Sequence, residues 1–273
     1  MKSRALLILV TLLVVVLPGI AVAETLVTIM TYNILAGGRP TDSRYGYDWY
    51  RLDEIIDLVS DVDPDILAIQ EAHGWESDME ILSEALQMPY CAWSTAEEWG
   101  GSTLMLFSKF EVIEVEDWPD SFAIGAMRVA VQLPSEDVLQ IFDVHLTPNV
   151  EGVNSTFVRS QETRTLIDLM EPYSNGLAVL VGDLNFRAFE FERYQKCPSC
   201  FYGETEGRIR PGILLSEAGW CLVASEDALG GLEQAWVPSA MQDAVQELEI
   251  GMENEELERL SDHFPIIVEC ALE

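Results

Sequence analysis

Apolar residues along the chain form short alternating runs and stretches with helical spacing. Residues 26–34 alternate and predict a strand, whereas apolar residues from Trp49 to Val59 fall at helical spacing and predict a helix. The apolar run 66–69 follows Pro64 and predicts a buried strand. Strands and helices therefore mix from the start, as in an α/β domain.

Strands outnumber helices in the rest of the chain. Further strands are predicted at 103–107, 111–115, 128–133, 138–144, 177–181, 234–237 and 264–270, and further helices at 77–86, 157–170 and 213–218, with an acidic helix between the last two strands. Residues 186–212 show no clear periodicity, and we interpret them as an insertion or lid. No repeat or flexible linker divides the chain, so residues 24–273 are predicted to form one domain.

The first 23 residues follow a different pattern. Basic Lys2 and Arg4 precede an apolar run over 5–17, and small residues follow up to Ala23. This order predicts a secretory signal peptide cleaved after Ala23, a secreted or extracytoplasmic location and no membrane span in the mature chain. The alternative is a retained anchor, because the apolar stretch approaches the roughly 17 to 25 residues that span a bilayer.

The chain is strongly acidic, with 15 Lys and Arg residues against 47 Asp and Glu residues and a formal net charge of −32. Such a surface repels polyanions, and few basic side chains are present to neutralise the phosphates of nucleic acid. Nucleic acid is therefore a less favoured partner, although about 1 M salt would shorten the repulsion to a few ångströms. Adaptation of a solvated surface to salt is the simplest interpretation of this charge.

Five cysteines are present, so at least one lacks a disulfide partner within the chain. Cys197 and Cys200 have the spacing of a zinc knuckle. A structural zinc site needs a second pair, however, and no other Cys or His pair has this spacing. We therefore favour a loop disulfide or free thiols over zinc.

Polar side chains of catalytic type stand at the ends of predicted strands. They are Asn33, Gln70, Glu71, His145, Asp183, Asn185, Asp262 and His263. Ligands of α/β folds bind at strand ends. Each residue alone has a simpler explanation, such as a helix cap, a turn or a surface charge, but their order along the chain is more specific.

This order resembles the endonuclease/exonuclease/phosphatase superfamily, whose members carry Thr-Tyr-Asn, Gln-Glu, Gly-Asp-x-Asn and Ser-Asp-His in sequence. The matching motifs here are Thr31-Tyr32-Asn33, Gln70-Glu71, Gly182-Asp183-Leu184-Asn185 and Ser261-Asp262-His263, with Asp143-Val144-His145-Leu146 as a further histidine block. The resemblance covers the chain after the signal, apart from the insertion. It implies an α/β four-layer sandwich with two mainly antiparallel sheets packed face to face and helices outside.

The resemblance also implies a metal-dependent hydrolase that acts on phosphate esters. Mg²⁺ prefers oxygen ligands and keeps several waters, so Glu71, helped by Asn33 and Asp262, is predicted to hold Mg²⁺, with Mn²⁺ as the alternative.

The remaining motif residues are assigned to catalysis. Asp183 is the candidate to orient or deprotonate the attacking water, and Asn185 is the candidate to hold the phosphate. His145 and His263 are predicted to donate to phosphate oxygens or to assist the leaving group.

One position departs from the family pattern. The family usually places an Asp in a late strand to orient the final histidine, and Glu233 takes that place here with one more methylene. The geometry around His263 is therefore less determined than the rest. Arg159 and Gln161, which follow His145, are interpreted as part of a solvated helix face.

The sequence thus predicts an exported, monomeric phosphoesterase that uses a divalent metal and water to cleave a small or lipid-linked phosphate ester or phosphodiester. Two alternatives remain open. One is a secreted nuclease, against which the negative charge argues. The other is a non-catalytic binding protein on the same fold. Its mark would be a missing metal ligand or histidine, and neither is missing.

Overall fold

The computed structural model describes residues 25–41, 46–94, 104–198, 207–226, 231–248 and 254–272. The predicted signal peptide, 1–23, lies outside the described residues, as does the middle of the predicted insertion. Among the helices that are described, none is both long and apolar enough to cross a membrane.

Two six-stranded sheets form the centre of the molecule. The first contains β1 (Thr25–Asn33), β2 (Ile66–Gln70), β3 (Tyr90–Trp93), β4 (Leu104–Ser108), β11 (Val245–Leu248) and β12 (Ile266–Leu272). The second contains β5 (Glu111–Asp117), β6 (Gly125–Gln132), β7 (Val138–His145), β8 (Ala178–Asp183), β9 (Trp220–Ser225) and β10 (Glu233–Pro238). The strand orders are β11-β12-β1-β2-β4-β3 and β5-β6-β7-β8-β10-β9.

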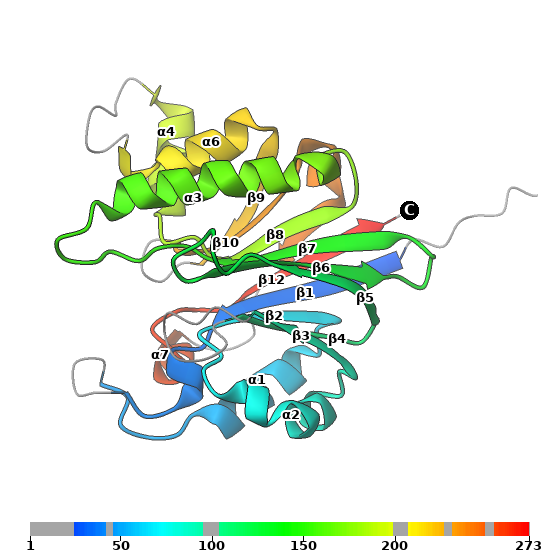
Figure 1. The fold of residues 1–273 in the computed structure, drawn as a ribbon. Coiled ribbons are helices and arrows are strands. Elements are labelled where there is room, and N and C mark those ends of the chain that lie inside the picture. The colour runs from blue at the N-terminus through cyan, green and yellow to red at the C-terminus, as the bar shows by residue number, and fades with distance from the viewer. Residues whose placement is uncertain are drawn as a thin grey trace, which may run out of the picture.

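Helices cover the outer faces of both sheets (Figure 1). The helices over the first sheet are α1 (Leu52–Val62), α2 (Met79–Leu86) and α7 (Asn254–Leu260), and those over the second are α3 (Ser155–Met170), α4 (Ala188–Lys196) and α6 (Arg210–Glu217). Short 3-10 helices are η1 (Ala36–Gly38), η2 (Trp75–Ser77), η3 (Glu171–Tyr173) and η5 (Ser239–Ala244). The predicted four-layer sandwich is confirmed.

The alternation along β1 explains how the layers pack. Val27 and Ile29 lie in the apolar core between the two sheets, whereas Met30 and Tyr32 belong to the core beneath α1. Successive side chains of a strand point to opposite faces, so both faces of β1 are buried. Each large aliphatic side chain buried in this way contributes about 1.5–3 kcal/mol to folding.

The sheet topology brings the predicted site residues to one edge. Each sheet has one parallel pair, β1 with β2 and β7 with β8, and these pairs align Asn33 with Gln70 and His145 with Asp183. The antiparallel strand β10 starts opposite Asp183, and β12 starts near the end of β1. Parallel pairs end at the same edge and antiparallel neighbours begin there, so distant motifs meet.

Three strands were not predicted: β3, β9 and β11. All three lie at sheet edges, and β11 alternates poorly because its middle residues face solvent. Part of segment 186–212, which shows no clear periodicity, is helical and forms α4. This helix packs Phe191 against Trp236, with ring centroids 5.4 Å apart. Cys197 is disulfide-bonded, whereas Cys91, Cys221 and Cys270 are free thiols.

Candidate active site

Asp183 lies at the centre of the site, at the end of β8. Its Oδ2 atom lies 3.2 Å from Nδ2 of Asn33. The same oxygen lies 3.4 Å from Nε2 of His145 and 3.6 Å from Nε2 of His263. Oδ1 accepts the backbone N–H of Asn185 at 2.9 Å, which orients the carboxylate. Three separate parts of the chain therefore present nitrogen atoms to one carboxylate oxygen.

The approach of β8 to β7 requires glycine. Gly182 has a φ of +127°, and a Cβ atom there would lie 2.1 Å from the carbonyl oxygen of Val144. Glycine thus lets His145 and Asp183 stand side by side. Asn185 follows with a φ of 53°, and its Nδ2 donates to the carbonyl oxygen of the residue after His145 at 3.0 Å.

Asn33 and Glu71 lie side by side at the ends of β1 and β2. Nδ2 of Asn33 lies 3.3 Å from Oε1 of Glu71, and Oε2 accepts the N–H of Ala36 at 2.9 Å. Gly37 donates its N–H to the carbonyl oxygen of Glu71 at 2.6 Å. A Cβ on Gly37 would lie 2.4 Å from the carbonyl oxygen of His73, so this contact also needs glycine. The two loops together hold the Glu71 carboxylate.

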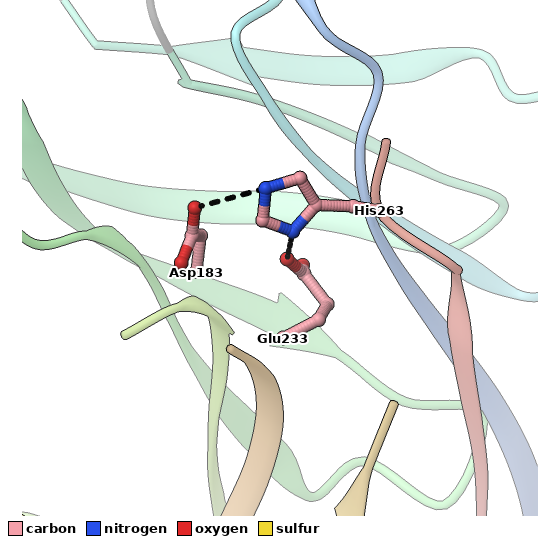
Figure 2. A group of neighbouring side chains, drawn as sticks. All are labelled: Asp183, Glu233 and His263. Carbon is pink, nitrogen blue, oxygen red and sulfur yellow. Dashed lines mark ion pairs between the residues drawn. The ribbon is translucent and has the colours of Figure 1, made fainter. Parts of the chain in front are cut away.

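His263 is surrounded by carboxylates (Figure 2). Its Nε2 faces Asp183, and its Nδ1 lies 3.7 Å from Oε2 of Glu233 and 3.5 Å from Oε1 of Glu226. Glu233 therefore stands within ion-pair distance of the imidazole despite its extra methylene, but neither Nδ1 of His263 nor Oε2 of Glu233 has a hydrogen-bond partner among the described residues. Ser261 supports the turn, because its Oγ donates to the carbonyl oxygen at the end of β1 at 2.7 Å and accepts the N–H of His263 at 3.2 Å.

Burial and charge act in opposite directions on His263. Burial lowers the pKa of His263, but the carboxylates of Asp183, Glu226 and Glu233 outweigh it and hold the pKa well above its ordinary value. Burial also raises the pKa of Glu233 well above its ordinary value, and Asp183 adds to the effect. The carboxylates therefore favour the protonated imidazole, which is a donor at both nitrogens.

Glu226 is a candidate site residue that was not predicted from the sequence. Its Oε1 accepts the N–H groups of Leu232 and Glu233 at 3.0 and 3.1 Å, and its Oε2 accepts that of Phe264 at 2.8 Å. One buried carboxylate thus joins the starts of β10 and β12 and keeps Glu233 beside His263. An acidic residue directly after an apolar strand was the signal that could have identified Glu226, but β9, the strand before it, was not predicted.

The oxygen donors of Glu71 and Asp262 fit a divalent cation. Oδ1 of Asp262 is buried and has no hydrogen-bond partner among the described residues. Burial raises the pKa of Asp262, His263 opposes this, and the Glu71 carboxylate adds repulsion. A cation would relieve both the burial and the repulsion, and Mg²⁺ prefers such oxygens. Oδ1 of Asn33 accepts the N–H of Leu35 at 3.1 Å, so Asn33 as a metal ligand stays a prediction.

A second set of metal-type side chains lies beside the first. Ligand atoms of Asp183, Glu233 and His263 all lie within 4.8 Å of one another. In Figure 2, however, the two carboxylates face different nitrogens of the same imidazole. A histidine offers one nitrogen to an ion, so this arrangement suits proton transfer better than shared coordination.

The prediction that Arg159 forms part of a solvated helix face is wrong. Arg159 is 3% exposed, and it donates from Nη1 to the carbonyl oxygen of Thr147 at 2.7 Å and from Nη2 to Oδ1 of Asn149 at 3.0 Å. Glu162 accepts the N–H of Thr147 at 3.0 Å. The prediction failed because polar side chains of α3 pack against the loop after β7. Gln161 is exposed, as expected.

Buried polar side chains link the two sheets behind the site. Gln70 donates from Nε2 to Oδ1 of Asp143 at 2.6 Å and to Oγ1 of Thr31 at 3.1 Å. Oγ1 of Thr31 lies 2.8 Å from Oε1 of Glu233 and donates to it. Burial raises the pKa of Asp143 well above its ordinary value, against the hydrogen bond from Gln70. This row therefore connects the sheet interface to the carboxylate beside His263.

The four-layer sandwich, with carboxylates, amides and two histidines at one edge, defines a class of α/β protein equipped for hydrolysis. Residues 30–203 match the Endonuclease/Exonuclease/phosphatase family, and the chain belongs to this family. Enzymes of this family are hydrolases of phosphoester bonds and generally use divalent metals. The resemblance inferred from the motifs is confirmed.

Several solved structures have the same fold. An endonuclease/exonuclease/phosphatase from Beutenbergia cavernae aligns with a TM-score of 0.66 and 12% identity over 90% of this chain and 72% of that one. The human Nocturnin catalytic domain with bound sulfate aligns with a TM-score of 0.64 and 14% identity over 90% and 96%. ANGEL2, a 2',3'-cyclic phosphatase in complex with adenosine-2',3'-vanadate, aligns with a TM-score of 0.62 and 12% identity over 92% and 97%.

No curated protein matches the chain in sequence. At the identities of the solved structures, the likeness establishes the fold alone.

Proposed function

We propose that this protein is a divalent-metal-dependent phosphoesterase that hydrolyses a small or lipid-linked phosphate ester or phosphodiester by attack of water. One observation carries the proposal: a single oxygen of Asp183 faces nitrogens of Asn33, His145 and His263 within 3.6 Å. This is an acceptor for a water proton surrounded by donors for phosphate oxygens, which is the equipment that in-line hydrolysis needs.

The side chains divide the reaction between them. Asp183 accepts a proton from water as the water oxygen forms its bond to phosphorus, and Asn33 holds the carboxylate in place. The carboxylates around His263 raise its pKa, and its Nε2, which stands beside the same Asp183 oxygen, donates to a non-bridging oxygen, while the departing oxygen takes its proton from solvent as the ester P–O bond breaks. His145 donates from Nε2 to a non-bridging oxygen, where negative charge grows.

Glu71 and Asp262 would hold the cation. Mg²⁺ or Mn²⁺, when bound, supplies a Lewis acid that neutralises phosphate charge. Without it, both carboxylates would repel an anionic substrate, since Glu71 and Asp262 already repel each other.

Two similar structures support a phosphate-type substrate. Nocturnin carries a sulfate, and ANGEL2 is a 2',3'-cyclic phosphatase seen with a vanadate. Sulfate and vanadate resemble phosphate in shape and charge. For this chain they favour the phosphoester class without selecting a substrate.

Export is a further part of the proposal. The basic, apolar and small-residue order of residues 1–23 supports cleavage after Ala23 and action outside the cytoplasm. Expression of the full chain in a bacterial host, followed by fractionation and N-terminal sequencing, tests this. A processed protein beginning at Glu24 in the periplasm or medium is expected, and an intact N-terminus in the membrane fraction would favour the anchor instead.

The activity is tested with p-nitrophenyl phosphate, bis(p-nitrophenyl) phosphate, sphingomyelin and plasmid DNA, in Mg²⁺, in Mn²⁺ and in EDTA. We expect turnover of at least one small or lipid substrate in the presence of metal and no turnover in EDTA. The Glu71→Gln variant should lose this turnover. Glu84→Gln, an exposed glutamate on α2, is the matched control and should retain activity. Preferential cleavage of DNA would select the nuclease alternative, and a folded protein inactive on every substrate would overturn the proposal.

A further inference from the structure

A cavity of about 360 Å³ lies directly beside the catalytic centre. Asn185 belongs to both, because its N–H binds Asp183 and its side chain lines the cavity. Arg187, two residues further along the same turn, lines the cavity as well. A molecule whose phosphate lies at Asp183 would therefore extend into this space.

The cavity gathers positive charge in a strongly acidic protein. Among the described residues that line it, Arg159, Arg187 and Arg208 stand against one carboxylate, Glu190. The whole chain has 15 Lys and Arg residues and a net charge of −32, so three arginines around one cavity form a local reversal of sign. Guanidinium groups match the geometry of phosphate and carboxylate oxygens.

The arginines play two different parts. Arg159 forms the base: it is 3% exposed, its terminal nitrogens bind Thr147 and Asn149, and its Nε makes no hydrogen bond to the described residues. Burial lowers the pKa of Arg159, while the carboxylates of Glu162 and Asp183 support its charge. This buried cation is therefore coupled to the catalytic carboxylate.

Arg187 and Arg208 form the outer part and are exposed. The side chain of Arg187 is 57% exposed, and its Nη1 lies 3.7 Å from Oε1 of Glu190, beyond hydrogen-bond distance. Oε2 of Glu190 is buried and makes no hydrogen bond to the described residues. Glu190 thus offsets part of the charge and leaves the donors of both arginines available to a ligand.

We propose that this cavity binds a second anionic group of the substrate, a phosphate separate from the one that is hydrolysed. The inference rests on the proposed function and narrows it to compounds with two phosphates. A solvated arginine face would account for Arg187 and Arg208 alone. It would not account for a cavity that is shared with Asn185 and also reaches the buried Arg159.

Binding is measured first, by calorimetry in Mg²⁺ on protein that carries Asp183→Asn, so that the cation is present and turnover is negligible. The probes are adenosine 3',5'-bisphosphate against adenosine 5'-monophosphate, and inositol 1,4-bisphosphate against inositol 1-phosphate. We expect one bisphosphate to bind about tenfold tighter than its monophosphate, the difference that one or two partly exposed charge-assisted contacts supply. The pair that shows the preference identifies a nucleotide or an inositol phosphate as the source of the group.

Arg187→Gln and Arg208→Gln should each remove most of this preference. Arg193→Gln is the matched control, because Arg193 is exposed on α4 but does not line the cavity, and it should keep the preference. Thermal unfolding of all variants checks their folding. A preference that survives both substitutions, or no preference in either pair, overturns the inference.

Turnover of p-nitrophenyl phosphate separates this inference from the proposed function. Normal metal-dependent turnover without any bisphosphate preference would leave the phosphoesterase proposal standing and reject the second site. Bisphosphate binding that depends on the arginines, without turnover of any phosphate ester, would support the anion site and reject the catalytic proposal.

Discussion

The proposed catalytic centre and the arginine-lined cavity share Asn185 but differ in how they hold charge. In the centre, His263 stands among three buried carboxylates, and each charge depends on its neighbours. In the cavity, Arg187 and Arg208 stand in solvent, where a charge is stable alone and interacts weakly. Burial makes ionised groups costly unless they are paired, so the centre must be assembled before substrate arrives. The exposed arginines of the cavity need no such pairing and can contribute to the choice between substrates.

The sharpest contrast is expected from Asp183→Asn, which keeps the size of the side chain. We expect kcat/KM to fall by about 10³-fold or more, because the acceptor for the water proton is lost. The loss should be equal for monophosphate and bisphosphate substrates, unlike the loss in the cavity variants. Steady-state kinetics on one pair of substrates measures it. Retention of a tenth of the activity would contradict the role of Asp183.

Glu233→Gln is the next largest change. It removes the charge beside Nδ1 of His263 while the hydrogen bond from Thr31 can be kept. We expect kcat to fall by about 10- to 100-fold, as for other residues that orient a catalytic group. Glu233→Asp, which restores the charge with a shorter side chain, should recover part of the loss. Equal activity of the Glu233→Gln variant and the wild type would show that Glu226 alone orients the imidazole of His263.

Glu226→Gln should act on stability more than on specificity. All its hydrogen bonds are accepted from backbone N–H groups, and an amide cannot accept at both ends. At least one buried N–H loses its acceptor, so the free energy of unfolding should fall by about 1–3 kcal/mol. Urea denaturation with EDTA measures the change. An unchanged unfolding midpoint would contradict the structural role of Glu226.

Salt concentration should affect the cavity more than the proposed catalytic centre, but the effect is smaller than those above. Between about 0.05 and 0.5 M NaCl, we expect KM for the preferred bisphosphate to rise about threefold to tenfold, because exposed charges are screened. kcat should change little, since the catalytic charges are buried. KM for the matching monophosphate should rise less. Equal salt dependence of both substrates would argue that the cavity makes no ionic contact.

The smallest change concerns Asp143, which lies between the sheets. Burial raises its pKa, so the folded protein keeps a proton that the unfolded chain releases above its pKa of about 4. The free energy of unfolding of the wild type should therefore fall as pH rises above this value. Asp143→Asn carries no such proton, and its stability relative to wild type should increase with pH. Urea denaturation at about pH 5 and pH 8 tests this, and a constant difference would contradict it.

Most of the architecture was predictable because each strand carries its own alternation. β1, β2, β7 and β8 appear close to their predicted bounds, and the residues at their ends occupy the site. Edge strands such as β11 were missed, because half-exposed strands have weak patterns. Arg159 was misjudged, because helical spacing does not reveal that the loop after β7 folds back over α3.

The sequence by itself determined the classes of the elements, the acidic surface and the motif residues, since these depend on local composition and spacing. Only the tertiary structure decided which of those residues face one another. Alternation assigns a side chain to a face of a strand, but strand order and register depend on how the whole chain packs. That packing sets His145 beside Asp183, encloses His263 within Glu226 and Glu233, and turns three arginines of an acidic chain toward one cavity.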